Sequence, residues 1–263
     1  MPNGEGSCRG LVLRSTDLGD HDKLLTVLTA ERGKLTICAK GAHSLKSKYM
    51  PVSQQFIYGD YTFREKGEGR WLKDGSIVES FFAVRAELTR LAAASYLMAV
   101  AEVLALEEEP DPELLRLSLN SLHLLTADKY PVAQIKAVFE LAAVSGAGFA
   151  PDLVFCSDCG KKTPYPAAFD LAGGVVYCAD CLKKREQAAQ FGEGREEYTA
   201  LTSLTPGVTD ALRHILSGAG NPFAFRLPEE ELRQLSGICE RYLLFQLDIS
   251  FKTLDFYHEV TSS

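Results

Sequence analysis

The sequence lacks any hydrophobic run long enough to cross a bilayer. Its most apolar stretch, Leu91–Leu106, is interrupted by Glu102 and is shorter than the roughly 20 residues that a transmembrane helix needs. The first residues are polar and glycine-rich, without the basic start and apolar core of a secretory signal. We therefore expect a soluble, cytoplasmic protein with no membrane partner.

The common catalytic motifs are also missing. The sequence has no nucleophile elbow, dinucleotide-binding fingerprint or kinase signature, and its Gly-Lys pairs lack the spacing of a phosphate-binding loop. The five histidines form no His-Glu-x-x-His pattern, and His123, within an apolar helical stretch, is expected to be a core residue. We expect a protein that is not an enzyme and has no catalytic residues.

Cysteine is present in an informative pattern. The seven cysteines are odd in number and the chain has no export signal, which argues against a disulfide framework. Four of them form two Cys-x-x-Cys pairs separated by 18 residues, namely Cys156, Cys159, Cys178 and Cys181. Four thiolates complete a tetrahedral zinc shell without an open position, so the pattern predicts one structural Zn²⁺. A redox dithiol and unmetallated cysteines are the alternatives.

Basic residues border these cysteines, among them Lys161 and Lys162. They have two interpretations: they offset the negative charge of the thiolates, or they contact the phosphates of a nucleic acid. We favour the first interpretation, because lysines beside a thiolate site have an electrostatic reason to be there without any ligand.

Charge is unevenly distributed along the chain. The net charge is -7, yet residues 1–80 contain twelve lysines and arginines against ten acidic residues. Within Lys23–Met50 six basic residues face one acid, Glu31. A local basic zone on an acidic protein is the distribution expected of a polyanion partner. A solvated loop is the alternative interpretation of its densest part, Ala39–Lys48.

Short apolar and aromatic runs separated by glycines predict strands in the first eighty residues, at 11–13, 24–28, 34–39 and 56–64. Leu35, Ile37 and Ala39 alternate with polar residues, so a strand here would turn them to the core and its lysines outward. Residues 66–69 and Asp74-Gly75 are expected to form turns. We predict a small β-barrel, a class that includes the OB-fold, with Phe56, Tyr58 or Tyr49 available to stack on bases.

From residue 83 the pattern becomes helical. Helices are predicted over 84–106, from the Asp111 N-cap to 125, from Pro131 to 146, over 206–216 and over 228–247. The fold class is therefore α+β: a barrel over 1–80, then a helical domain over 81–263 with an inserted zinc module at 155–182.

Three segments in this order resemble the RecO family of bacterial DNA repair proteins. They are DHDKLLTVLTAERGKLTICAKGAHSLKSK at 20–48, FELAAVSGAGFAPDLVFCSDCG at 139–160 and YLLFQLDISFKTLDF at 242–256. The similarity covers nearly the whole chain, and its most specific parts are the first segment and the Gly-x-x-Pro approach to CxxCG. The third segment departs somewhat, with Ser250–Leu254 where the family has a more basic Lys-Ser-Leu.

The resemblance implies an N-terminal OB-fold and a zinc-bearing helical domain. It also implies binding to single- and double-stranded DNA, annealing of complementary strands, and loading of RecA onto DNA coated by single-strand binding protein, together with RecR. The helical domain would bind the acidic C-terminal tail of single-strand binding protein, and the protein would be cytoplasmic and nucleoid-associated. By position in the matching segment, the DNA-binding candidates are Arg32, Lys34, Lys40, Lys46 and Lys48. Arg14, which lies outside that segment, is added from the residues alone as a weaker candidate.

A zinc-ribbon adaptor that binds only protein partners through its acidic helical domain is the alternative function. The two hypotheses differ in one observable: the adaptor does not bind DNA.

Overall fold

The computed structural model describes residues 4–190, 200–218 and 220–262. The chain divides into two compact units, each of which is described by itself. The first unit contains Met1–Lys129 and Phe251–Ser263, and the second contains Tyr130–Ser250. The predicted boundary near residue 80, between the barrel domain and the helical domain, is a different division from these two units, and it stays a prediction.

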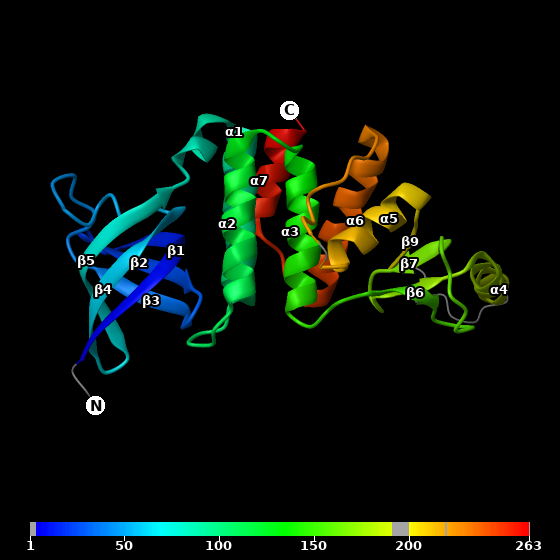
Figure 1. Cartoon of the computed structure of the whole chain (residues 1–263), viewed down its shortest axis with the longest axis horizontal. Coiled ribbons are helices and arrows are strands. Elements are labelled where there is room, and N and C mark those ends of the chain that lie inside the picture. The colour runs from blue at the N-terminus through cyan, green and yellow to red at the C-terminus, as the bar shows by residue number, and fades with distance from the viewer. Residues whose placement is uncertain (1–3, 191–199, 219, 263) are drawn as a thin grey trace. The chain divides into compact units, whose positions relative to one another are not determined.

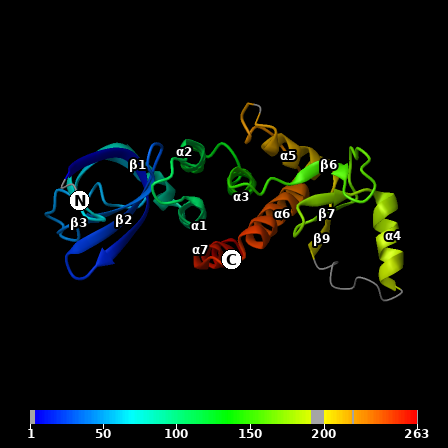
Figure 2. The same cartoon turned by 90° about the horizontal axis from the view of Figure 1, so that it is seen from below.

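Five strands of the first unit close into a barrel in the order β1-β2-β3-β5-β4, whose closed ring is visible in Figure 2. Neighbouring strands are antiparallel except for β3 and β5, whose parallel pairing closes the ring. The strands are β1 (Gly4–Leu18), β2 (Asp22–Thr29), β3 (Gly33–Ala39), β4 (Ile57–Lys66) and β5 (Gly69–Ser80). With the helices that follow, the predicted α+β class is confirmed.

The alternation predicted for β3 is confirmed. Leu35, Ile37 and Ala39 are each at most 1% exposed and lie in the barrel core, which also contains Tyr61 and Phe63. The residues between them are partly exposed on the outer face. The side-chain period of a strand therefore fixes which residues of β3 are available to a ligand.

Strand β5 was not predicted. The expected turn at Asp74-Gly75 is wrong, because both residues continue β5, whereas the turn predicted at 66–69 does join β4 to β5. Leu72 pairs with Phe63 and Asp74 pairs with Thr62, which leaves Lys73 as an extra residue in a β-bulge. The bulge exposes Lys73 and Asp74 together, and this local polarity is what resembled a turn.

Three α-helices complete the first unit: α1 (Leu88–Leu104), α2 (Pro112–Ala127) and α7 (Lys252–Thr261), with a short 3₁₀ turn, η1 (Phe82–Ala86). Helix α1 packs against both α2 and α7 (Figure 1). The predicted N-cap is confirmed, since the Asp111 carboxylate accepts a hydrogen bond from Leu114 N–H at 2.9 Å. The expectation for His123 is wrong: it is exposed, on the outer face of α2.

The second unit combines helices with a small sheet. Helix α3 (Val132–Gly146) packs along α6 (Glu229–Leu247), and both contact α5 (Pro206–Leu216). The sheet has the order β6-β8-β7-β9, and α4 (Ala179–Gln190) follows β8. Its strands are β6 (Asp152–Cys156), β7 (Ala168–Asp170), β8 (Val175–Tyr177) and β9 (Leu201–Ser203). The predicted helices are confirmed, whereas the sheet and helix α7 were not predicted.

Candidate metal centre and nucleic-acid surface

The four predicted cysteines lie together in the second unit. Cys156 ends β6, Cys159 lies in the tight turn after it, Cys178 directly follows β8, and Cys181 is in the first turn of α4. Their sulfur atoms all lie within 4.8 Å of one another, and Cys159 Sγ is 3.9 Å from Cys178 Sγ. A tetrahedral shell with metal–sulfur bonds of about 2.3 Å separates its sulfurs by about 3.8 Å. The four cysteines are therefore arranged to hold a metal ion.

The local backbone prepares these sulfurs for a cation. Gly160 has a φ of +66° and closes the first turn, with its N–H donating to the Cys156 carbonyl at 2.9 Å. Burial opposes ionisation of Cys156, but N–H groups, led by that of Cys178, donate to its sulfur and lower the pKa to about 6. Hydrogen bonding with Cys178, followed by burial, raises the pKa of Cys181 to about 12. A bound cation would compensate the negative charge that four neighbouring sulfur ligands bring together.

A second contact ties helix α4 to the first cysteine turn. Arg185 donates two hydrogen bonds to Asp158, at 2.7 and 2.6 Å, and its guanidinium lies 4.3 Å from the ring centroid of Tyr177. Arg185 therefore holds the two halves of the cysteine site together from outside it. Arg185 is one of the basic residues that border the cysteines, and its charge is paired with Asp158, so the interpretation of these residues as charge compensation for the thiolates stays a prediction.

The six basic residues predicted for the barrel fall into two groups. The first group contacts other parts of the first unit. Arg14 pairs with the Glu102 carboxylate at 2.7 Å, and Lys34 Nζ donates to the Glu102 carbonyl at 2.8 Å. Arg32 pairs with Glu65 at 2.9 Å and lies over the Phe63 ring. These three side chains have structural contacts that a nucleic acid would have to share or replace.

The second group lies at and after the other end of β3. Lys40, Lys46 and Lys48 are exposed on the segment that joins β3 to β4. Within the described residues, neither Lys40 nor Lys46 forms an ion pair. Lys48 lies 3.4 Å from Asp74 and donates to the Lys73 carbonyl at 3.1 Å. These lysines can meet a phosphate without breaking a buried contact.

The predicted stacking aromatics need correction. Phe56 is only 1% exposed, so it belongs to the interior and not to a ligand surface. Tyr58 and Tyr49 are partly exposed, and the Tyr49 hydroxyl donates to the Lys73 carbonyl at 2.8 Å. The prediction overlooked Trp71, the single tryptophan of the chain, which lies partly exposed on β5. In the sequence the local signal is the apolar Leu72 that follows it, because the two side chains would point to opposite faces of a strand; no strand was predicted over these residues.

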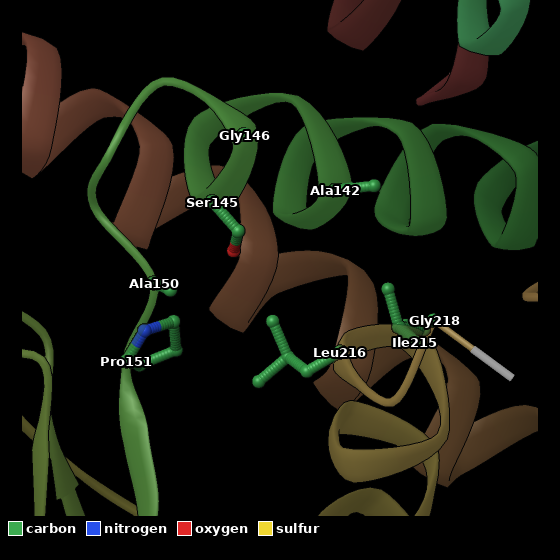
Figure 3. A pocket seen from close by; sticks show the side chains of 8 residues that line it. All are labelled: Ala142, Ser145, Gly146, Ala150, Pro151, Ile215, Leu216 and Gly218. Atoms are coloured by element: carbon green, nitrogen blue, oxygen red, sulfur yellow. The ribbon is translucent and has the colours of Figure 1, made fainter. Parts of the chain in front are cut away.

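An apolar hollow of about 470 Å³ lies in the second unit, between the end of α3, the segment before β6 and the end of α5 (Figure 3). Its lining residues are Ala142, Ser145, Gly146, Ala150, Pro151, Ile215, Leu216 and Gly218. None of them is charged, and none was predicted as a site residue. The hollow has no charged side chain that could bind a charged ligand, and its lining contains no acid–base group for catalysis.

Among the helices of the described residues, none combines the length and the apolar composition required to pass through a bilayer.

Comparison with known families and proteins gives consistent matches. The family model described as Recombination protein O N terminal matches residues 3–81, and Recombination protein O C terminal matches residues 85–255. The chain is 28% identical over 248 residues to DNA repair protein RecO of Acetivibrio thermocellus, covering 94% of each chain. It is 31% identical over 252 residues to DNA repair protein RecO of Myxococcus xanthus, covering 95% of this chain and 96% of the relative. It is 32% identical over 162 residues to DNA repair protein RecO of Halalkalibacterium halodurans, covering 62% of this chain and 63% of the relative.

Proposed function

Because this chain belongs to the RecO family of DNA repair proteins, as its resemblance predicted, we propose that it acts as a recombination mediator. It binds single- and double-stranded DNA and anneals complementary strands. With RecR, it helps RecA to load onto DNA coated by single-strand binding protein. It changes the association of other molecules and does not turn over a substrate, and it works in the cytoplasm at the nucleoid.

In this proposal the barrel is an OB-fold and the DNA-binding domain, with residues 1–80 as the domain and 81–263 as the helical domain. The observation that carries the proposal is the pair of exposed lysines, Lys40 and Lys46, which lack ion-pair partners among the described residues. They lie beside a closed five-stranded barrel, a scaffold suited to nucleic acid. An exposed cation without a partner loses little when it binds a phosphate, because no existing interaction is broken.

The physical basis is charge neutralisation. Lysines that contact phosphates release condensed counterions, so affinity falls as salt rises. With about four contacts on a single strand, the logarithm of affinity falls with the logarithm of salt concentration at a slope of roughly -3. Lys40, Lys46 and Lys48 supply the most accessible contacts. Arg14, Arg32 and Lys34 contribute less, because each keeps an intramolecular partner.

The same charges explain annealing. Two complementary strands repel each other through their phosphates, and a basic surface that neutralises both lowers this repulsion. The acidic C-terminal tail of single-strand binding protein binds the helical domain and brings the mediator to coated DNA.

The four cysteines hold one Zn²⁺ in a structural role. A shell of four thiolates leaves no position for water or substrate, so the ion supplies folding free energy and no catalysis. Cys156, Cys159, Cys178 and Cys181 fit this ion in number, in donor type and in the mutual distances of their sulfurs.

The test is the affinity of the full chain for a labelled single-stranded oligonucleotide over a range of salt concentrations. Replacing Lys40 and Lys46 by glutamate should weaken binding by at least about tenfold and flatten the salt slope by roughly 1.4, or 0.7 per lost contact. Lys252→Glu, at an exposed lysine that begins α7, is the control and should change affinity little.

Two results would contradict the proposal. Equal affinities of the wild type and the Lys40→Glu/Lys46→Glu variant would remove the lysines from the DNA surface. No DNA binding by the wild type would favour the zinc-ribbon adaptor, whose partners are proteins only.

A further inference from the structure

Trp71 occupies an outward position on the barrel. It is the direct neighbour of Cys38 on β3 and of Arg64 on β4. Paired residues of adjacent strands project from the same face of a sheet. Cys38 is partly exposed and Arg64 is exposed, whereas the next residue, Leu72, lies in the barrel core. The indole therefore belongs to the outer surface formed by β3, β5 and β4.

A glycine lets the indole lie close to the backbone. A Cβ atom built on Gly69 would be only 2.3 Å from Trp71 Cη2 and 2.8 Å from Cζ3. Any side chain at position 69 would have to displace the ring. The absence of a side chain on Gly69 thus allows the indole to lie across the start of β5, where it stays partly exposed. An aromatic ring held in this way has little conformational freedom to lose when a flat ligand stacks on it.

Cations border this ring on two sides. Arg64 is exposed next to it and forms no ion pair within the described residues. Lys73 is two residues along β5, and Lys48 Nζ donates to the Lys73 carbonyl at 3.1 Å. Cys38, the partner of Trp71, lies one residue before the end of β3 at Ala39, so Lys40 follows the strand residue next to the ring by only two positions. The ring is therefore flanked by Arg64 on β4 and by the end of β3 that leads into Lys40, with Lys73 further along its own strand.

The acidic groups of this surface are weakly held. Lys73 pairs with Glu5 at 2.9 Å, and both side chains are about half exposed. Lys48 and Asp74 are 3.4 Å apart and still more exposed. Exposed ion pairs of this kind contribute little to stability, so a phosphate can take the place of the carboxylate.

We propose that Trp71, held against Gly69 and bordered by Arg64 and the lysines, is a stacking site for an unpaired nucleobase of single-stranded DNA. The proposal rests on the proposed DNA-binding function and adds to it a base contact. The ring stacks on the base while the surrounding cations bind the phosphates on either side. Every base has a flat face, so the site accepts any sequence. In a duplex the bases are already stacked, so the same ring gives double-stranded DNA no comparable contact.

The experiment uses the full chain and its own fluorescence. Because the chain contains one tryptophan, its emission reports on Trp71 alone. Titration with oligothymidylate should quench this emission as the strand binds. Trp71→Ala should reduce affinity for oligothymidylate by about 5- to 150-fold, the range measured for loss of one stacked base. Trp71→Phe should retain most of the affinity, and both variants are checked for an unchanged melting temperature.

Two further ligands separate stacking from a general loss of binding. On an abasic strand, which keeps the phosphates but has no bases, wild type and Trp71→Ala should bind equally. On duplex DNA the two should also bind equally. Gly69→Ala, which moves the ring without removing it, should weaken binding to oligothymidylate and leave duplex binding unchanged.

The outcomes distinguish this inference from the function on which it rests. If oligothymidylate binds without quenching and Trp71→Ala binds as well as the wild type, the stacking site is wrong. If Lys40→Glu/Lys46→Glu still weakens binding in that case, the DNA-binding function stands. If the wild type binds no DNA, the proposed function and the stacking site both fail.

Discussion

A buried group of charges in the second unit gives a prediction whose size follows from the structure. Lys136 on α3 has no exposed side-chain surface, and its Nζ lies 2.8 Å from Glu140 and 2.6 Å from Glu240 on α6. The Glu140 side chain is also fully buried, and that of Glu240 is 16% exposed. Burial lowers the pKa of Lys136, but the two carboxylates, Glu140 first, outweigh burial and raise it above its ordinary value. The lysine is therefore charged at neutral pH.

Lys136→Met keeps a side chain of similar length and removes the charge. It leaves the buried Glu140 without its cation, and removing one partner of a buried pair costs about 3–5 kcal/mol. The folded-to-unfolded ratio should fall by roughly 150- to 5,000-fold. Folding raises the pKa of Lys136, so the charged lysine stabilises the folded state fully at any pH below its pKa in the unfolded chain. This stabilisation is lost only as the pH rises through the pKa of Lys136 in the folded protein. The Lys136→Met variant should therefore show the whole decrease in the free energy of unfolding at neutral pH.

The measurement is urea unfolding followed by circular dichroism. Lys252→Met, at an exposed lysine, is the control and should change the free energy of unfolding by no more than about 0.5 kcal/mol. Lys136→Met combined with Glu140→Gln should recover part of the stability, because the uncompensated charge is gone. A loss below about 1 kcal/mol for Lys136→Met would refute this reasoning.

Two further predictions concern the cysteine site and a helix terminus. Cys178→Ser, or a chelator, should release one zinc per chain and lower the melting temperature, with a smaller effect on DNA binding. Metal analysis and calorimetry test this. An unchanged melting temperature would contradict it. Asp111→Ala should destabilise the protein by about 1 kcal/mol in urea unfolding, because Leu114 N–H loses its acceptor, whereas Asp111→Asn should behave as the wild type. Equal losses for both substitutions would exclude the capping explanation.

Local patterns in the sequence predicted much of the fold. The alternation of β3 depends only on residues of one strand, and the Asp111 cap depends only on residues of one helical turn. Both could therefore be predicted from a short stretch of the sequence. Strand β5 was missed because its bulge at Lys73 places polar residues side by side and hides the alternation. Helix α7 was missed because only two of its residues, Leu254 and Tyr257, are buried, which leaves a weak periodicity.

For the candidate sites too, features that depend on local sequence were predicted and features that depend on distant residues were not. The cysteine pairs were predicted because their spacing is local and their chemistry is specific. The partners of the basic residues were not, because Glu102, which binds both Arg14 and Lys34, is far away in the sequence. Trp71 depends on the registers of β3 and β4 against β5, which only the folded barrel establishes.

The most direct test of the proposed mediator function is annealing of two complementary strands, each coated by single-strand binding protein, with and without the full chain. We predict that the wild type accelerates duplex formation and that Lys40→Glu/Lys46→Glu does so much less, with Lys252→Glu equal to the wild type. Duplex formation at the same rate with and without the wild-type protein would contradict the proposed function.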